Sequence, residues 1–126
     1  MHIQIEPASD IPIYTQLANQ LIALIAKKEL KPNDTLPSVR SLAADLGVNM
    51  HTVNKAYHEL QQKGIISVIP KSGAVINPIP EVSSESSRDR MRETLHPLIA
   101  ESIVYGMSRD EILSLASSLI SELTEE

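Results

Sequence analysis

The chain has 126 residues and a formal net charge of −5, and it contains no cysteine, no tryptophan and no phenylalanine. This length suits one domain with an appendage, and the lack of cysteine excludes a disulfide framework and a thiolate zinc site. Apolar runs fall short of the roughly 20 residues of a membrane span, and no signal leader opens the chain. We therefore expect a cytoplasmic protein without membrane contact.

The first third of the chain predicts a short strand and a helix. Residues 2–6 alternate, with Ile3 and Ile5 on one face, which is typical of a short edge strand. Asp10 can cap a helix, and Pro12 lies near its start, where a missing N–H costs little. Apolar residues at helical spacing then predict a helix from residue 13 to about residue 29, ended by a turn at residues 31–34. These residues are Leu17, Leu21, Leu24 and Ile25.

Two short helices separated by a glycine-containing turn follow. Ser38 is the expected N-cap of the first and Asn49 that of the second, and Gly47 and Gly64 end them. Their buried stripes are Val39, Leu42, Ala43 and Leu46, and then Val53, Ala56, Tyr57 and Leu60. This arrangement is a helix-turn-helix. The β-rich residues 65–69 and 74–76, joined by a four-residue loop at 70–73, predict a β-hairpin and complete a winged helix.

The rest of the chain predicts a linker and two more helices. Residues 78–87 are rich in proline and serine, and a helical stripe then runs to Tyr105, with Pro97 predicting a kink or an interrupted first turn. Ser108–Glu111 is a capping box for the last helix. A hairpin of this size cannot bury its own apolar surface. It can pair with the winged helix, with a second copy of itself, or with both, and among these we expect self-association. The expected dimerisation residues are Leu95, Leu98, Ile99, Ile103, Ile112, Leu115, Leu119 and Leu123.

The predicted fold is therefore mainly α, in the α+β class. Residues 1–77 form a winged helix-turn-helix DNA-binding domain, residues 78–87 a linker, and residues 88–126 a short two-helix dimerisation hairpin. Acidic residues are concentrated at the end of the chain: residues 1–80 carry seven Lys and Arg against six Asp and Glu, whereas residues 81–126 carry four against ten. Because charges are screened beyond about 10 Å, the overall negative charge does not exclude a nucleic-acid partner.

Residues for catalysis or metal binding are not apparent. The four histidines are scattered, and the two on the second helix of the helix-turn-helix, His51 and His58, lie seven residues apart, too far to chelate one ion without other ligands. Turns and helix ends account for the four glycines. We expect no catalytic residue, no metal, no cofactor and no enzyme activity.

Short polar residues crowd the first turn of the helix that begins after Asn49, where a recognition helix meets base edges. Asn pairs with adenine, and Lys55 is a cation within range of a phosphate. Arg40 is exposed beside the groove entrance, and Lys71 and Ser72 occupy the hairpin tip. The alternatives are a solvated polar face, a surface ion pair of Arg40 with Asp45 or Glu59, and simple turn chemistry at the tip.

Several spaced motifs resemble the GntR family of bacterial transcription regulators. They are Pro12-Ile13-Tyr14-x-Gln16, Leu36-Pro37-Ser38-Val39-Arg40-x-Leu42-Ala43, Leu46-Gly47-Val48-Asn49, Thr52-Val53-x-Lys55-Ala56-Tyr57-x-Glu59-Leu60 and Gly64. They span about residues 11–76. The short helical tail resembles the YtrA subfamily, which lacks the large effector-binding domains of its relatives.

The resemblance implies a homodimeric repressor with each recognition helix in a major groove of a pseudo-palindromic double-stranded DNA operator. Subfamily members often repress operons that encode ABC transporters. Many relatives carry Arg at the place of Met50, or Pro-Asn at the place of Met50-His51, and Gly at the place of Lys71. The resemblance therefore implies DNA binding but does not carry over the base preference or the approach of the wing to DNA. The expected DNA-binding residues are Ser38, Arg40, Asn49, Met50, His51, Thr52, Asn54, Lys55, Lys71, Ser72 and Gly73.

Other functions remain open at the level of the sequence. A winged helix can serve as a protein-interaction module without sequence-specific DNA binding, with the acidic tail as its docking surface. The polar positions of the tail give little support for a ligand pocket between its helices, which leaves a small-molecule effector undecided.

Overall fold

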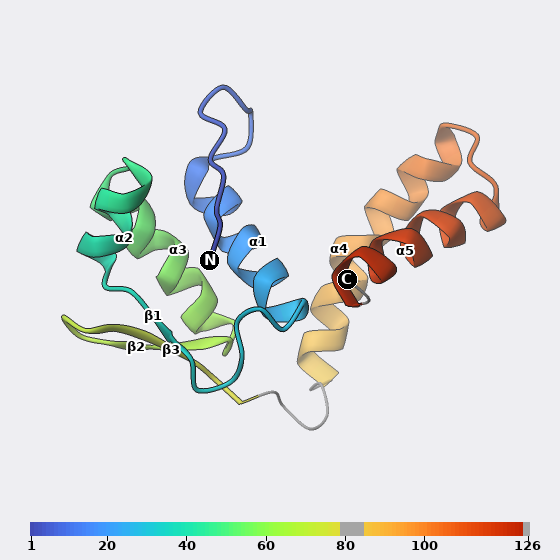
Figure 1. Ribbon diagram of the computed structural model, residues 1–126. Helices are drawn as coiled ribbons and strands as arrows, with labels where there is room; N and C mark the ends of the chain where they lie inside the picture. Colours follow the sequence, from blue (N-terminus) through green and yellow to red (C-terminus); the bar gives the residue numbers. More distant parts are fainter. Residues whose placement is uncertain (79–84, 125–126) are drawn as a thin grey trace. The chain divides into compact units, whose positions relative to one another are not determined.

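The computed structural model describes residues 1–78 and 85–124 and divides the chain into two compact units, Met1–Ile79 and Pro80–Glu126. We call them the N-terminal and the C-terminal unit. The N-terminal unit is a winged helix, and the C-terminal unit is a pair of helices (Figure 1). The elements are α1 (Ile13–Ala26), β1 (Thr35–Leu36), α2 (Val39–Leu46), α3 (Met50–Gln62), β2 (Ile66–Ile69), β3 (Gly73–Ile76), α4 (Glu85–Val104) and α5 (Arg109–Thr124).

The core of the N-terminal unit is aliphatic, apart from one tyrosine. Helix α3 packs against α1, α2 and β2, so it is the central element of the unit. The predicted buried stripe of α3 is confirmed, and Leu42 and Ala43 of α2 are buried as well, while Val39 and Leu46 are half-buried. The cluster consists of Leu17, Ala18, Leu21, Leu36, Leu42, Ala43, Val53, Ala56, Tyr57, Leu60, Ile66, Ala74 and Ile76.

Side chains fix the ends of the helix-turn-helix as the sequence predicts. The Ser38 hydroxyl accepts a hydrogen bond from the Ser41 N–H at 3.1 Å, and the Asn49 side chain accepts one from the His51 N–H at 2.7 Å. Gly47 ends α2 with φ +68, in the left-handed region that glycine adopts at little cost. The capping box of α5 also forms, with Ser108 and Glu111 each bonded to the backbone N–H of the other.

The sheet has three antiparallel strands in the order β1-β3-β2, and β1 is a strand that the sequence does not predict. Strand β1 has two residues, Thr35 and Leu36, which pair with Val75 and Ala74. Such a short strand leaves no alternation to detect. Gly73 pairs with Ile69, so the predicted four-residue loop is shorter and consists of residues 70–72.

The N-terminal segment is not the predicted edge strand. Residues 2–6 run beside α1 (Figure 1), and two glutamine side chains of that helix hold them. The Gln16 amide bonds both the N–H and the C=O of Glu6, and the Gln20 amide does the same for Gln4. These amides replace a neighbouring strand, because a side-chain amide offers the same donor and acceptor as a peptide group.

Three predicted helix boundaries also differ. Pro12, rather than Asp10, is the N-cap of α1, without a side-chain cap, and α1 ends at Ala26 instead of near residue 29. Lys28 follows with φ +65, a conformation that stops the helix early. Helix α4 begins at Glu85, so the last three residues of the predicted linker are helical; residues 79–84 lie outside the described residues. Helix α4 runs through Pro97 without interruption, so the predicted interruption of its first turn is not observed.

Candidate nucleic-acid interface

A groove of about 510 Å³ lies between α2, α3 and the β2–β3 hairpin. We call this hairpin, with its turn at Pro70–Ser72, the wing. Three separate elements bring five predicted DNA-binding residues to the groove, and these are Ser38, Arg40, Asn54, Lys71 and Gly73. Val39, Val68, Ile69 and Pro70 complete the lining. Residues predicted at the helix-turn-helix and at the wing tip thus border the same groove.

Arg40 is exposed at the start of α2, and among the described residues it makes no ion pair. The alternative predicted from the sequence, a pair with Asp45 or Glu59, is not formed. Glu59 instead pairs with Lys63 one helical turn later, at 3.5 Å. The Arg40 guanidinium therefore remains available to an anionic partner, and its planar donor array suits phosphate or guanine.

The first turn of α3 presents polar side chains to solvent beside one methionine. His51 and Asn54 are exposed, Thr52 is half-buried, and Met50 is 45% exposed. The Asn49 oxygen is occupied by the cap, so its amide NH₂ remains for another partner. Of these residues, Asn54 lines the groove and the others do not.

Lys55 is held against α1. Its ammonium lies 4.2 Å from the centroid of the Tyr14 ring, a cation–π contact worth about 0.5–1 kcal/mol at an exposed site. The sequence predicts a cation within range of a phosphate, whereas the structure gives this cation an intramolecular partner. The two residues are far apart in the chain, so no local pattern could reveal the contact.

Tyr57 lies in the core, as its spacing predicts, and it also forms a hydrogen bond with the backbone before α2. Its hydroxyl donates a hydrogen bond to the Pro37 carbonyl at 2.7 Å, and 1% of the residue is exposed. Burial raises the pKa of Tyr57 to about 12, because the charged form would lose its solvation. This bond ties the chain just before Ser38 to α3. Tyr57 thereby fixes the start of α2, where Arg40 lies, relative to the recognition helix.

Gly73 is the first residue after the turn of the wing, and it lies close to the backbone of β1. A Cβ atom at this position would lie 2.2 Å from the Leu36 carbonyl oxygen and 2.9 Å from the Pro37 carbonyl carbon, and φ is +112. Only glycine permits both the close approach and this conformation. Gly73 is buried, so among the predicted wing-tip residues it supports the wing, while Lys71 and Ser72 are exposed at its tip.

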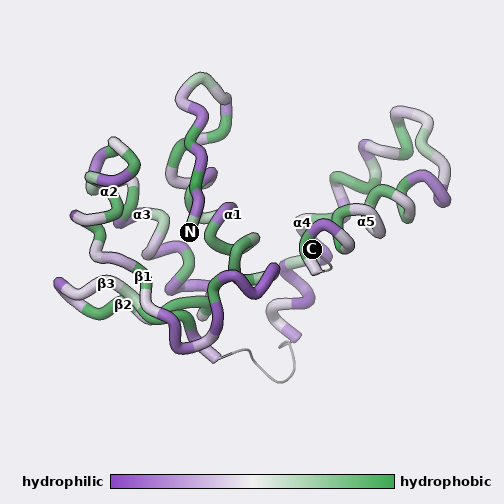
Figure 2. Tube along the Cα trace, in the orientation of Figure 1, coloured by the Kyte–Doolittle hydropathy of each residue, from purple (hydrophilic) through white to green (hydrophobic). Residues whose placement is uncertain are grey.

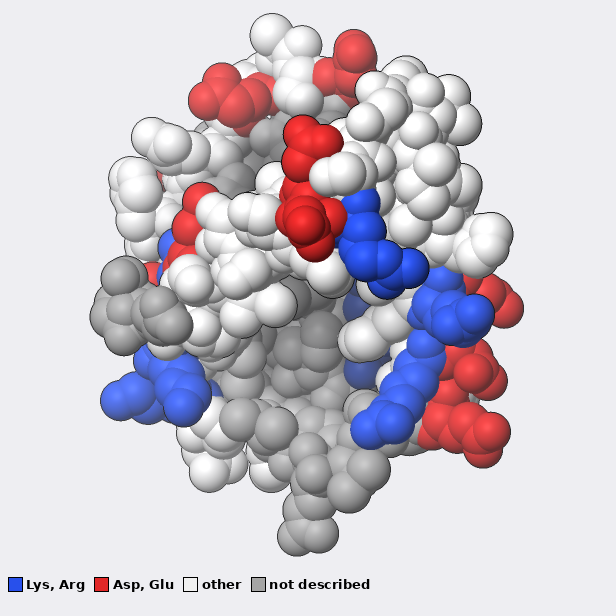
Figure 3. All heavy atoms as spheres, turned by 90° about the vertical axis from the view of Figure 1, so that its right-hand side faces the viewer, with Lys and Arg blue, Asp and Glu red and all other residues white. Residues whose placement is uncertain are grey.

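The C-terminal unit exposes an unusual amount of apolar surface. None of the described residues of α4 or α5 is buried, although hydrophobic stretches recur along both helices (Figure 2). Six predicted dimerisation residues are 37–60% exposed, namely Leu95, Leu98, Ile99, Ile103, Leu115 and Leu119. Ile112 and Leu123 are half-buried. The face of the molecule in Figure 3 is mostly uncharged, with basic and acidic side chains interspersed.

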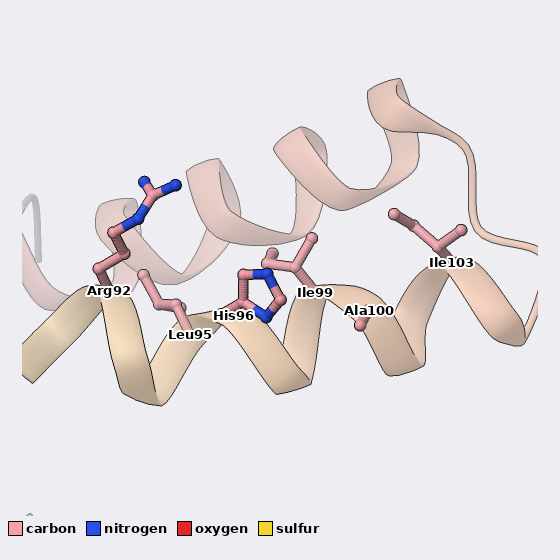
Figure 4. A pocket seen from close by; sticks show the side chains of 6 residues that line it. All are labelled: Arg92, Leu95, His96, Ile99, Ala100 and Ile103. Atoms are coloured by element: carbon pink, nitrogen blue, oxygen red, sulfur yellow. The ribbon is translucent and has the colours of Figure 1, made fainter.

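One side of α4 carries a shallow apolar hollow. Leu95, Ile99 and Ile103 line it together with Ala100, and Arg92 and His96 form its polar rim (Figure 4). Its volume is about 300 Å³. Such a row of aliphatic side chains at helical spacing is the surface that a partner helix covers.

Within the described residues, no helix combines the length and the apolar character that a bilayer crossing demands. The same residues contain no group of three or more His, Asp or Glu side chains placed to hold a metal ion.

The motifs of the N-terminal unit match a known family. Residues 13–76, from α1 to β3, fit the model of the bacterial regulatory proteins of the gntR family. The chain belongs to the GntR family. Its resemblance to the YtrA type is supported by the HTH-type transcriptional repressor YtrA of Bacillus subtilis strain 168, which is 37% identical over 87% of this chain and 85% of its own length.

Solved structures give the same result for this GntR-family chain. YtrA from Sulfolobus acidocaldarius, a GntR-family transcription factor, is 45% identical, covers 96% of this chain and 98% of its own, and superposes with a TM-score of 0.62. A protein from Listeria monocytogenes EGD-e described as a transcriptional antiterminator is 27% identical and reaches a TM-score of 0.90 over 98% of this chain and 92% of its own. The chain is accordingly a transcriptional regulator with a DNA-binding winged helix-turn-helix.

Proposed function

We propose that this GntR-family regulator is a homodimeric repressor that binds a pseudo-palindromic operator through the groove between α2, α3 and the wing. The carrying observation is the convergence of Arg40, Asn54 and Lys71 from three elements on that groove. An arginine, an amide and a lysine are the side chains that read guanine, adenine and phosphates. The first turn of α3, with Met50, His51 and Thr52, supplies the remaining contacts in the major groove.

Charge supports this assignment. The N-terminal residues 1–80 carry a formal net charge of +1, while residues 81–126 carry the acidic excess. Binding to phosphates releases counterions, so the affinity for DNA falls steeply as the salt concentration rises. A DNA surface confined to the N-terminal unit leaves the acidic unit free for self-association.

The apolar surface of α4 and α5 supports a dimer. Burying one leucine side chain contributes about 1.5–3 kcal/mol, and the six exposed residues of the predicted dimerisation set lie on these two helices. A second copy offers the same surface, which a two-fold axis makes self-complementary. Two recognition helices then meet half-sites one helical turn apart, about 34–36 Å, or a multiple of it.

We infer repression from a relative of this chain, since the YtrA protein of Bacillus subtilis is described as a repressor. A bound dimer that overlaps a promoter blocks transcription by occupancy, without a catalytic step.

Selection of bound duplexes from a random pool tests the proposal directly. We expect the full chain to enrich an inverted repeat and to bind it as one dimer per duplex in sedimentation velocity. Placing the enriched repeat over a reporter promoter should lower expression when the protein is present. Recovery of unrelated duplexes, or a monomer on the DNA, would refute the operator model, and increased expression would refute repression.

A further inference from the structure

The side chain of Asn77, the residue after β3, is bonded to two other parts of the N-terminal unit. Its amide NH₂ donates to the carbonyl of Gly64, in the turn between α3 and β2, at 2.9 Å. Its amide oxygen accepts from the hydroxyl of Ser67 on β2 at 2.7 Å. The Asn77 backbone N–H donates to the Ile65 carbonyl at 3.0 Å. We call these three hydrogen bonds the Asn77 clamp.

The clamp ties Asn77 to the recognition helix. Gly64 directly follows Lys63, the C-cap of α3. In the last turn of the same helix, the Gln61 side chain accepts a hydrogen bond from the Val68 N–H of β2 at 2.8 Å. The end of α3 is therefore bonded to β2 and, through Gly64, to Asn77. A displacement of Asn77 relative to α3 breaks hydrogen bonds.

Asn77 is also the place where the chain leaves the sheet. Strand β3 ends at Ile76, and the exposed Pro78 follows Asn77. Proline has no N–H with which to continue a strand pairing. Residues 79–84 then connect the N-terminal unit to α4. The Asn77 clamp thus fixes the point from which the chain departs toward the C-terminal unit.

The clamp lies at the end of the hairpin that is remote from the DNA-binding groove. Strands β2 and β3 pair from Ile66 with Ile76 to Ile69 with Gly73, and the turn of the wing joins the latter end. Asn77 does not line the groove. A change at Asn77 therefore leaves the groove side chains in place and alters only the anchor between each recognition helix and the C-terminal unit.

We propose that the Asn77 clamp determines which separation of the two half-sites the dimer accepts. This inference rests on the proposed function, in which two copies of the chain bind two half-sites. Without the side-chain bonds, Asn77 and Pro78 can leave the sheet and join the connection to α4, which grows from six residues to eight. An extended chain spans at most about 3.6 Å per residue, so each connection gains about 7 Å.

This gain matches a step along the DNA. Base pairs follow one another at about 3.4 Å, so about 7 Å is the rise of two of them. Two base pairs also rotate one half-site by about 70° about the helix axis, because a turn contains 10–10.5 of them. A longer connection lets the second recognition helix follow such a shift, whereas the clamped chain cannot. Asn77 is thus a positioning residue that acts through α3.

The test measures the affinity of the full chain for duplexes that carry both selected half-sites at the selected separation, or with two base pairs added or removed between them. We expect wild type to bind the selected separation about tenfold more tightly than either altered one. Asn77→Ala should reduce this ratio to about threefold or less. Its affinity for a duplex with one half-site should equal that of wild type.

Two comparisons separate positioning from stability. Gln61→Ala removes a hydrogen bond between α3 and β2 but leaves the Asn77 clamp, so it should lower the melting temperature and keep the wild-type ratio. Ser67→Ala removes one bond of the clamp and should lower the ratio in part, whereas Ser67→Thr keeps the hydroxyl and the wild-type ratio. The Ser67 pair decides if Asn77→Ala does not fold.

The results distinguish this inference from the proposed function. The role of the clamp would be overturned if Asn77→Ala kept the wild-type ratio, if Gln61→Ala lost it as well, or if wild type bound all separations equally. Loss of affinity for the single half-site in Asn77→Ala would also overturn it, because a positioning residue leaves that affinity unchanged. Failure of wild type to prefer the half-sites over unrelated DNA would overturn the proposed function instead.

Discussion

Arg40 combines exposure with the absence of an ion pair among the described residues. We expect Arg40→Ala to weaken binding to the selected operator by about 1–3 kcal/mol, the range for loss of a base contact, while the free energy of unfolding stays within about 0.5 kcal/mol of wild type. Fluorescence anisotropy and urea titration measure the two quantities. Lys63→Ala is the control, since Lys63 pairs with Glu59 on α3 and its loss should spare DNA affinity. Unchanged affinity of Arg40→Ala would remove this residue from the interface.

Tyr57 links the recognition helix to the start of α2 by one hydrogen bond. We expect Tyr57→Phe to lower the free energy of unfolding at pH 7 by about 1 kcal/mol, because the Pro37 carbonyl loses its donor. Urea titration of both proteins measures this difference. A variant as stable as wild type would mean that water replaces the hydroxyl.

The pKa of Tyr57 also predicts that the free energy of unfolding depends on pH in the alkaline range. The pKa of folded Tyr57 is about 12 against an ordinary 10.0, so the folded state keeps its proton more tightly than the unfolded chain. This contribution is fully present below pH 10 and is lost as the pH rises through 12, by about 3 kcal/mol in total. The stability advantage of wild type over Tyr57→Phe should therefore fall above pH 10 and change sign before pH 12, because the loss exceeds the roughly 1 kcal/mol expected at pH 7. A constant difference would contradict this.

At the scale of elements, the wing depends on the contact between Gly73 and β1. We expect Gly73→Ala to destabilise the N-terminal unit by at least about 2 kcal/mol, from overpacking against the Leu36 carbonyl and from the left-handed conformation. Gly47→Ala is the matched control: φ is +68, but nothing lies within 4 Å of the added carbon. Its cost should be about 1 kcal/mol. Thermal unfolding compares the two, and equal losses would mean that the close approach is relieved by a small shift.

The sequence predicted those elements that are determined by residues close together in the chain, such as helix caps and helical apolar stripes. Ser38, Asn49 and Ser108 cap helices because each side chain bonds its own first turn, and the stripe of α3 follows the helical period. The sequence did not predict strand β1, because its partner β3 is distant in sequence. It also did not predict the course of residues 2–6, because these residues are bound by glutamines of α1. Spacing could place candidate residues on α2, on α3 and at the wing tip, but not show that they share one groove, nor that Tyr14 engages Lys55.

At the scale of the molecule, the C-terminal unit carries the prediction for assembly. Leu95 and Leu119 are about half exposed, at 53% and 48%. We expect Leu95→Glu combined with Leu119→Glu to convert the proposed dimer into a monomer in light scattering. Each leucine buried in that dimer would contribute about 1.5–3 kcal/mol, and the introduced charges add a desolvation penalty. Affinity for the full operator should fall to that of a single half-site.

Ile11→Glu is the control for added charge, since Ile11 is 50% exposed in the N-terminal unit. It should leave the dimer and the operator affinity intact. Circular dichroism should show unchanged helix content for all variants. A double variant that remains dimeric would locate the interface elsewhere.

The two glutamines of α1 have a consequence for how this chain can vary. The side chains of Gln16 and Gln20 form hydrogen bonds with the peptide groups of Glu6 and Gln4, and not with the side chains of those residues. Because these hydrogen bonds go to backbone groups, substitution of the side chains at positions 4 and 6 should leave the course of this segment along α1 unchanged. The residues that determine the position of this segment therefore lie in α1 and not in the segment itself.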